Sequence, residues 1–151
     1  MTTIVVTAAV VEREGRFLVT RRQQGVHLEG FWEFPGGKCE PDEPLAACLL
    51  REIREELAVD AAIGVELLTT THAYPERSVE LHFFRCDLHG IPAPQLGQEM
   101  RWVAREELAG LKFPPADAEL IGQLTNGSFA TSADAPSTDS FVPGSTKSRC
   151  T

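Results

Sequence analysis

The sequence predicts an α/β fold, with one globular domain over residues 1–124 and a tail over residues 125–151. Short apolar runs typical of β-strands alternate with two segments in which apolar residues recur at helical spacing. Of the 151 residues, 42% are hydrophobic and 24% are charged, as in an average soluble domain. A chain of this length builds one hydrophobic core but has little room for two. We therefore expect a single site to explain the function.

The chain begins with a pattern typical of β-strands. Residues 4–11 are almost continuously apolar and β-branched, and residues 17–20 resume that run after a turn at Glu14-Gly15, which predicts a buried β-hairpin. A polar loop over residues 23–30 then leads to a short aromatic segment and to Pro35-Gly36-Gly37, a strong chain breaker. The backbone is expected to bend tightly there.

The clearest helix begins after Asp42. Pro44 lies in its first turn, where the missing N–H of proline is harmless. Its apolar stripe consists of residues that recur every four positions: Leu45, Leu49, Ile53 and Leu57. Further strands are expected at residues 65–71, 79–86 and 100–103, and a closing helix at residues 114–124.

The composition changes after Leu124. Thr, Ser, Ala, Gly, Asp and Pro dominate there, and the only sizeable apolar residues are Phe129, Phe141 and Val142. Such a segment has too little apolar surface to offset the entropy lost on ordering. We therefore predict that residues 125–151 form a disordered tail.

Charge and cysteine usage exclude several classes of protein. A net charge of -8 argues against direct binding of DNA or RNA, which needs a basic face, whereas a small anionic substrate carried by a metal ion is compatible. No run approaches the roughly 18 apolar residues of a membrane span, and no signal peptide is evident. The four cysteines, Cys39, Cys48, Cys86 and Cys150, contain no CxxC pair, so neither a zinc site nor a disulfide framework is indicated. These features predict a cytoplasmic protein with reduced thiols.

Three carboxylates share one edge of the predicted helix. At 100° per residue, Glu52, Glu55 and Glu56 fall within an arc of about 100° beside the apolar stripe. Like charges at this spacing destabilise a helix by roughly 0.2 to 0.5 kcal/mol per pair. A divalent cation bound between the carboxylates would turn this repulsion into attraction. Carboxylate oxygens favour Mg²⁺ or Mn²⁺, which neutralise phosphates and activate water. The alternative is a solvated acidic face paired with Arg51 and Arg54.

The segment from Gly37 to Val59 resembles the Nudix box, which runs Gly, five residues, Glu, seven residues, then Arg-Glu-apolar-any-Glu-Glu-any-Gly-apolar. Eight of these nine defined positions match, and the exception is Ala58, where the family has glycine. Residues 30–38 and 113–117 are similar to the MutT branch of the family, so the resemblance covers about residues 4–124. It implies an α/β/α sandwich around a mixed β-sheet.

The resemblance also implies roles for the residues of the box. Glu52, Glu55 and Glu56, with the Gly36 carbonyl, would bind the metal ion, and the carboxylates would activate water. Arg51 would orient the carboxylates through charge-assisted hydrogen bonds, with Glu43 as its partner across the loop. The phosphates of the substrate would lie against Gly37 and Lys38.

Outside the box the correspondence with MutT enzymes is less complete. Those enzymes have a further glutamate six residues before a tryptophan, and Leu96 stands at that position before Trp102. Glu99 is the expected substitute as a metal ligand if the loop shifts, and an ordinary surface glutamate is the alternative. The base-side pocket would be built from Ile4, Val6, Arg22, Phe34, Tyr74, Arg77, Phe113 and Asp117. For Ile4, Val6 and Phe113, ordinary core packing is the competing interpretation.

The function implied by the resemblance is Mg²⁺-dependent hydrolysis of a nucleoside triphosphate to the monophosphate and pyrophosphate. The first expected substrate is 8-oxo-dGTP, in sanitation of the nucleotide pool, and the alternative is CTP or 5-methyl-dCTP. Two further hypotheses are a non-catalytic Nudix-like binding module and a purely structural acidic domain. The expected partner is a small nucleotide, with no nucleic acid or membrane, and the oligomeric state stays open.

Overall fold

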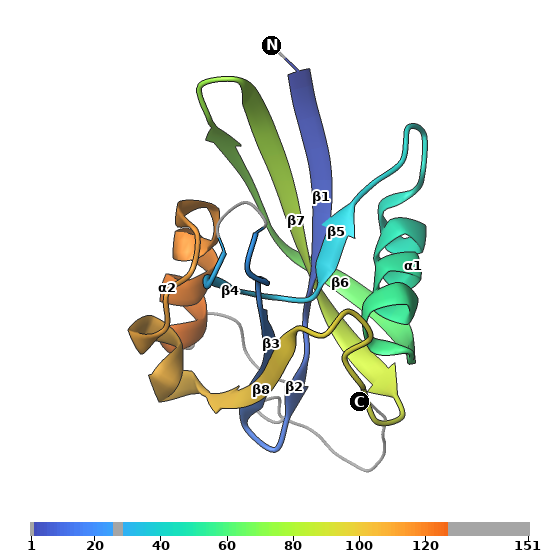
Figure 1. The fold of residues 1–151 in the computed structure, drawn as a ribbon, viewed down its shortest axis with the longest axis vertical. Helices are drawn as coiled ribbons and strands as arrows, with labels where there is room; N and C mark the ends of the chain where they lie inside the picture. The colour runs from blue at the N-terminus through green and yellow to red at the C-terminus, as the bar shows by residue number, and fades with distance from the viewer. Residues whose placement is uncertain (1, 26–28, 127–151) are drawn as a thin grey trace.

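Two β-sheets lie at the centre of the structure, a computed structural model that describes residues 2–25 and 29–126 (Figure 1). The first sheet has the strand order β5-β1-β7-β6, with the bounds Gly36–Lys38, Thr2–Val10, Arg77–His89 and Asp60–Ala73. In the second sheet, β3 (Arg16–Arg21) pairs with three strands: β2 (Glu12–Arg13), β4 (Trp32–Glu33) and β8 (Glu99–Ala104).

The first sheet is mixed. Its strand β1 runs parallel to β7, in continuous register from Thr2 opposite Arg77 to Val10 opposite Arg85. On its other edge β1 pairs with β5 in the antiparallel sense, and β6 and β7 form a long antiparallel hairpin. Because strands of both orientations meet at β1, the mixed sheet implied by the family resemblance is confirmed.

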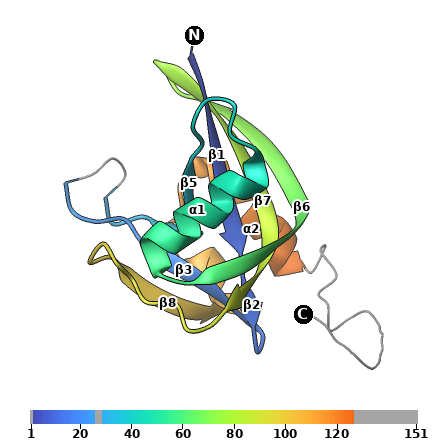
Figure 2. The ribbon, with the colours of Figure 1, turned by 90° about the vertical axis from the view of Figure 1, so that its right-hand side faces the viewer.

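Helices cover the two sides of the strands. The helix α1 (Leu45–Leu57) crosses one side of the first sheet and lies in front of β1 in Figure 2. On the opposite side lie α2 (Ala118–Asn126) and the short 3₁₀ helices η1 (Arg105–Gly110) and η2 (Pro115–Asp117), at the left of Figure 1. The arrangement confirms the predicted α/β/α sandwich. None of the described helices has the length and apolar character needed to span a membrane.

The alternation of side chains along β1 divides the hydrophobic core in two. Ala8 and Val10 pack on the side of α2, whereas Ala9 packs on the side of α1 with Leu49 and Ile53. These α1 residues are fully buried, which confirms the apolar stripe predicted from the four-residue spacing. The stripe fixes the rotation of α1, and it thereby places the neighbouring glutamates at the edge of the core.

The predicted first hairpin forms at its turn, where β2 and β3 pair in the antiparallel sense around Glu14-Gly15, but its paired region is short. The run over residues 4–11 lies mostly in β1, whose two edges are occupied by β5 and β7. Residues 17–20 lie in β3, which belongs to the second sheet and pairs with β2 at the turn. Only one backbone bond, from Leu18 N–H to the Val11 carbonyl at 3.1 Å, joins the two runs beyond that turn. Apolar patterning identified both strands, but it carries no information about partners.

The end of the domain also differs slightly from the prediction. The expected helix over residues 114–124 is a 3₁₀ turn, η2, followed directly by α2, which continues to Asn126. The boundary predicted at residue 124 therefore falls inside α2. Residues 127–151, to which the prediction of a disordered tail mainly applies, lie outside the described residues.

The exit of α1 carries a strained alanine. Ala58 adopts the left-handed conformation, with φ 55° and ψ 42°, and its N–H donates to the Arg54 carbonyl at 3.1 Å. This is the position at which the Nudix box has glycine, the residue without a steric penalty in this conformation.

We expect Ala58→Gly to stabilise the fold by about 1 kcal/mol, since it relieves the left-handed strain without removing a buried contact. Urea denaturation at constant m-value measures the change. The matched control is Ala47→Gly, at an exposed position inside α1, which should destabilise by about 0.5 to 1 kcal/mol. Equal destabilisation by both substitutions would contradict the strain.

Candidate active site

The carboxylates of α1 lie directly against the two glycines of β5. A Cβ atom at Gly37 would overlap the Glu52 carboxylate, and a Cβ atom at Gly36 would overlap the Thr7 carbonyl oxygen. Gly36 also has φ 155°, which a side chain rarely tolerates. The Gly36 N–H donates to Glu56. The two glycines thus allow the helix carboxylates to approach the strand backbone closely.

Arg51 forms hydrogen bonds with two carboxylates, Glu43 in the loop before α1 and Glu52 in α1. Its Nε and Nη2 atoms donate to the two oxygens of Glu43, each at 2.9 Å, in a bidentate ion pair. Its Nη1 atom donates to Glu52 Oε2 at 2.9 Å, and its Nη2 atom also donates to the Lys38 carbonyl at 3.2 Å. The guanidinium lowers the pKa of Glu43 to about 2. Arg51 therefore ties the loop before α1 to Glu52, and Glu43 is the partner expected from the sequence.

Glu55 differs from its two neighbours. Its side chain is 58% exposed, and its Oε2 atom accepts a 3.4 Å hydrogen bond from Arg51 Nη1. Glu52 and Glu56, by contrast, are half-buried and hydrogen-bonded to each other. The structure therefore brings two of the three predicted carboxylates together and leaves the third at the solvent-facing side of the helix.

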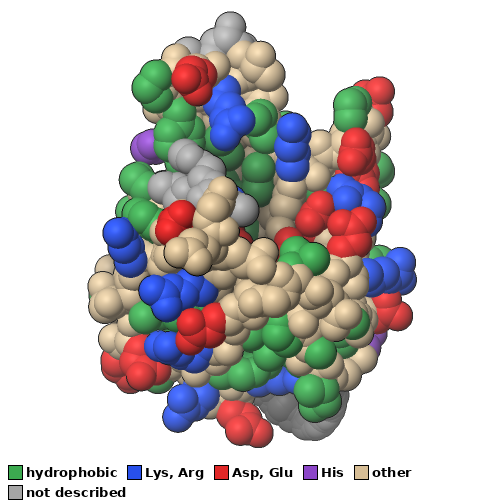
Figure 3. All heavy atoms as spheres, in the orientation of Figure 1, with side chains coloured by type: hydrophobic (Ala, Val, Ile, Leu, Met, Phe, Trp, Pro, Cys, Tyr) green, Lys and Arg blue, Asp and Glu red, His purple; other side chains and the backbone are tan. Residues whose placement is uncertain are grey.

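A cavity of about 500 Å³ opens beside Glu56, between the strands of the two sheets. Figure 3 shows the molecular face on which the surface is hollowed, with acidic side chains gathered over α1 on one side. The residues predicted for the site that line the cavity are Ile4, Val6, Arg22, Phe34, Gly36, Gly37, Lys38, Glu56, Tyr74, Arg77 and Asp117. Most of the predicted pocket thus surrounds one space that ends at the carboxylates.

Three acidic side chains that line this cavity have raised pKa values. Burial, and then the nearby Glu33 and Glu52 charges, raise the pKa of Glu56 to about 9. Burial and the Glu33 charge raise the pKa of Asp117 to about 7. Glu33 itself has a pKa raised by burial, opposed by Arg22, whose Nη1 lies 2.9 Å from its Oε1. In the absence of a cation, Glu56 therefore retains its proton near neutral pH, and Asp117 is partly protonated.

Glu33 was not predicted as a site residue. It lies in β4 between the buried Trp32 and Phe34, so that its side chain lines the cavity between two anchors in the core. A charged residue flanked by two aromatic residues was the available signal. Gln98, which also lines the cavity, carried no local signal at all.

The structure places two predicted site residues elsewhere. Phe113 stacks on Phe34 with ring centroids 5.4 Å apart and packs against the core, in agreement with the competing core interpretation. Glu99 does not line the cavity, because it lies in β8 opposite Arg21 and pairs with Arg21 and Arg101. Its suggested role as a replacement metal ligand is therefore not supported by its position.

The loop before β8 is attached to the end of α1. Ala93 N–H donates to the Leu57 carbonyl at 2.9 Å, and Gln95 N–H donates to the Glu56 carbonyl at 2.8 Å. The Gln98 side-chain amide also donates to the Glu56 carbonyl, at 3.4 Å. These bonds satisfy helix-end carbonyls and hold Leu96 at the cavity. The loop therefore keeps the position of the family's additional glutamate, but with an apolar side chain.

The donor set beside the cavity fits a hard divalent cation. Glu52 and Glu56 offer only oxygen atoms, the ligands that Mg²⁺ and Mn²⁺ prefer. The raised pKa of Glu56 shows that this buried carboxyl, with Glu33 and Glu52 nearby, retains a proton, which a cation would replace.

Comparisons with known proteins point to one family. The model of the NUDIX domain matches residues 6–123. The CTP pyrophosphohydrolase of Escherichia coli (strain K12) is 36% identical over 122 residues, which make up 80% of this chain and 90% of the relative. The 8-oxo-dGTP diphosphatase of Haemophilus influenzae is 34% identical over 126 residues, or 82% of this chain and 92% of the relative.

A solved structure supports the same relationship. The solution structure of the E. coli ORF135 protein has a TM-score of 0.76 and 35% sequence identity, and the match covers 89% of this chain and 96% of that chain. The box on α1 and β5, the mixed sheet and the match over most of the chain agree with one another. The chain belongs to the NUDIX family, as a MutT-type hydrolase with nucleoside triphosphate pyrophosphohydrolase activity.

Proposed function

We propose that the chain hydrolyses a nucleoside triphosphate to the monophosphate and pyrophosphate with Mg²⁺ held by the α1 carboxylates. The observation that supports this most strongly is the convergence of Glu52 and Glu56 on β5 at the edge of the cavity. Bound there, Mg²⁺ would neutralise phosphate charge and lower the pKa of a water molecule. Mn²⁺ has similar ligand preferences and is the alternative ion.

The side chains around the cavity divide into two groups with different tasks. Glu52 and Glu56 hold the cation, and Arg51 fixes the orientation of Glu52 through their 2.9 Å hydrogen bond. Lys38, at the rim, carries the charge that orients the phosphates. Glu55 contributes less to cation binding than Glu52 and Glu56, because its side chain faces solvent. The second group, which includes Glu33 and Asp117, lies deeper and contacts the base.

We infer that the base is of the cytosine type. The cavity holds two carboxylates, Glu33 and Asp117, and an ionised carboxylate accepts hydrogen bonds but cannot donate one. The amino group of cytosine supplies donors for such acceptors. The relative named CTP pyrophosphohydrolase, at 36% identity, supports the same choice.

The second candidate is 8-oxo-dGTP, the substrate in the name of the relative from H. influenzae. The resemblance places Asp117 where MutT has an asparagine that reads the oxidised base. With a pKa raised to about 7, Asp117 is partly protonated near neutral pH, and its neutral form can donate and accept as asparagine does. The two candidates therefore differ in the protonation state of one side chain.

Loss of either converging carboxylate should impair the chemistry. We expect Glu52→Gln and Glu56→Gln each to lower kcat at least about 100-fold, the scale of a lost activating group, with the fold intact. Steady-state pyrophosphate release measures kcat, and circular dichroism checks the fold. Glu119→Gln, at an exposed position of α2 on the opposite side of the sheet, is the matched control. Wild-type turnover in both site variants would rule out this metal site.

Binding of Mg²⁺ should release a proton. Because the pKa of Glu56 is raised to about 9, its carboxyl is protonated at pH 7 without a cation. We expect release of about one proton per Mg²⁺ at pH 7, and an affinity that rises about tenfold per pH unit until it levels off near pH 9. Calorimetry in buffers with different ionisation enthalpies counts the protons. Glu56→Gln should bind with no such release, and a pH-independent wild-type affinity would contradict the assignment.

Asp117→Asn should change the choice of base. The neutral amide cannot become a pure acceptor, so we expect the ratio of kcat/KM for CTP over 8-oxo-dGTP to fall about tenfold or more, roughly 1.4 kcal/mol. In the wild type this ratio should rise from pH 6 to pH 9 as Asp117 ionises, and in the variant that dependence should be lost. Identical ratios for the two proteins at every pH would show that Asp117 does not contact the base.

A further inference from the structure

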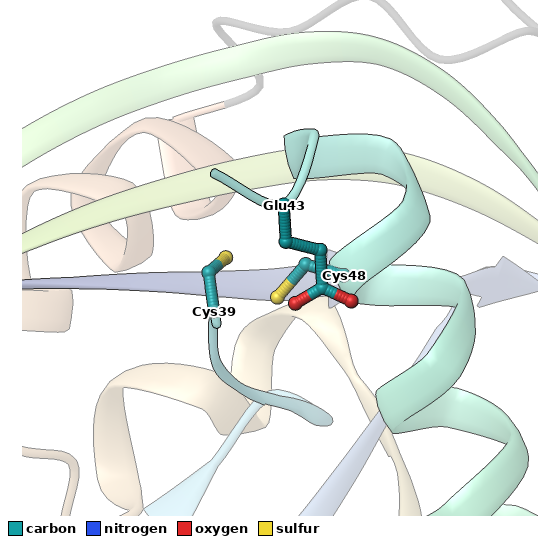
Figure 4. Close-up of side chains that lie close together, drawn as sticks. All are labelled: Cys39, Glu43 and Cys48. Atoms are coloured by element: carbon teal, nitrogen blue, oxygen red, sulfur yellow. The ribbon is translucent and has the colours of Figure 1, made fainter. Parts of the chain in front are cut away.

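Two thiols and a carboxylate converge beside the first turn of α1 (Figure 4). Cys39 and Glu43 come from the loop between β5 and α1, and Cys48 comes from the helix itself. One ligand atom of each residue lies within 4.8 Å of the others. In Figure 4 the three side chains point toward a common space.

The fold creates this cluster from residues that the sequence separates. The backbone N–H of Glu43 donates to the Glu40 carbonyl at 3.1 Å, and Asp42 within this turn has φ 64°. The turn brings the loop alongside the helix. The sequence alone predicted no zinc site, because its cysteines form no CxxC pair. Here the third donor is a carboxylate, and Cys39 and Cys48 approach each other only through the turn.

The thiols have only weak partners in the structure. The Cys48 Sγ atom is buried, at 3.3 Å from Thr7 Oγ1 and 3.9 Å from the Gly37 carbonyl oxygen. Cys39 is partly exposed, so an ion can reach the cluster from solvent. Sulfur ligands favour thiophilic ions such as Zn²⁺ and Cd²⁺, whereas Mg²⁺ prefers oxygen alone. The donor set therefore differs in kind from that of Glu52 and Glu56.

We propose that Cys39, Cys48 and Glu43 form a second cation site, which binds one thiophilic divalent ion such as Zn²⁺. Each of the two sulfur–metal bonds forms as the thiol loses its proton to solvent, so binding of one ion releases two protons. Three protein donors leave one position of a tetrahedral ion for water. Two thiolates and the carboxylate offset the charge of the ion and the repulsion from nearby Arg51.

The second site is coupled to the active site through Glu43. Both Glu43 oxygens accept hydrogen bonds from Arg51 at 2.9 Å, and the same guanidinium holds Glu52 and the Lys38 carbonyl. A cation on a Glu43 oxygen competes with Arg51 for that oxygen. Occupancy therefore loosens the support of Glu52 and slows hydrolysis, a consequence that rests on the proposed function.

Cadmium titration of the reduced protein tests the site, because the cadmium–thiolate charge-transfer band reports sulfur ligands directly. Excess Mg²⁺ is present so that the oxygen ligands of the active site are occupied. We expect one equivalent of Cd²⁺ to produce a charge-transfer band with the intensity of two cadmium–thiolate bonds. Cys39→Ser should halve the band and weaken binding at least about tenfold, since loss of even an outer-shell partner costs that much at metal sites.

Two control variants separate this site from the other thiols. Cys86→Ala removes a buried thiol outside the cluster, and Cys150→Ser removes a cysteine that lies outside the described residues. Both should bind Cd²⁺ as the wild type does. Unchanged binding by Cys39→Ser, or absence of the band in the wild type, would overturn the site. Loss of free thiols with a mass decrease of two hydrogens and no band would assign the pair to disulfide formation instead, and would also overturn it.

The effect of the second site on hydrolysis is measured separately from binding. Hydrolysis by the wild type should slow at Cd²⁺ concentrations that saturate the band, whereas Cys39→Ser, which retains basal activity, should be affected only at concentrations at least about tenfold higher. Equal sensitivity of the two proteins would overturn the coupling. The binding titration does not depend on hydrolysis, so failure of the proposed activity and failure of the second site are distinguishable.

Discussion

The close approach of α1 to the glycines of β5 is the constraint on which the site depends. Glu52 occupies the volume that a side chain at Gly37 would need, and Gly36 leaves no room for a side chain against β1. This approach forces the Glu52 and Glu56 carboxylates together in a half-buried environment, where like charges are poorly screened. Arg51 offsets part of this repulsion, and a divalent cation would offset the remainder. The same constraint that destabilises the empty cluster makes it selective for a cation.

The rest of the fold maintains this approach. The stripe of Leu49, Ile53 and Leu57 fixes the rotation of α1 on the sheet, and the loop before β8 holds the end of the helix through the Glu56 and Leu57 carbonyls. The second sheet and η2 close the cavity on the opposite side and contribute Glu33 and Asp117. The carboxylates of the box and the residues proposed to contact the base thus come from different layers of the fold.

Local patterns predicted the parts of the site that depend on local structure. The four-residue spacing identified α1, and the box identified the row from Arg51 to Glu56, because both are properties of one helix. Pairing between distant strands is not encoded in such patterns, so the pairing of β1 with β5 and β7 was not predicted. Glu33 and the Cys39–Cys48 cluster were missed for the same reason. The exposure of Glu55 also depends on how the neighbouring loop packs, which periodicity alone does not describe.

We propose that the carboxylate cluster directs water to a phosphoanhydride of a nucleoside triphosphate in a reaction that needs a divalent ion. The most direct measurement is product analysis after incubation of the purified chain with CTP and with 8-oxo-dGTP, with and without Mg²⁺. We expect that Mg²⁺ is required and that the products are the nucleoside monophosphate and pyrophosphate in equal amounts. Release of inorganic phosphate and a diphosphate, or equal turnover without a divalent ion, would contradict it.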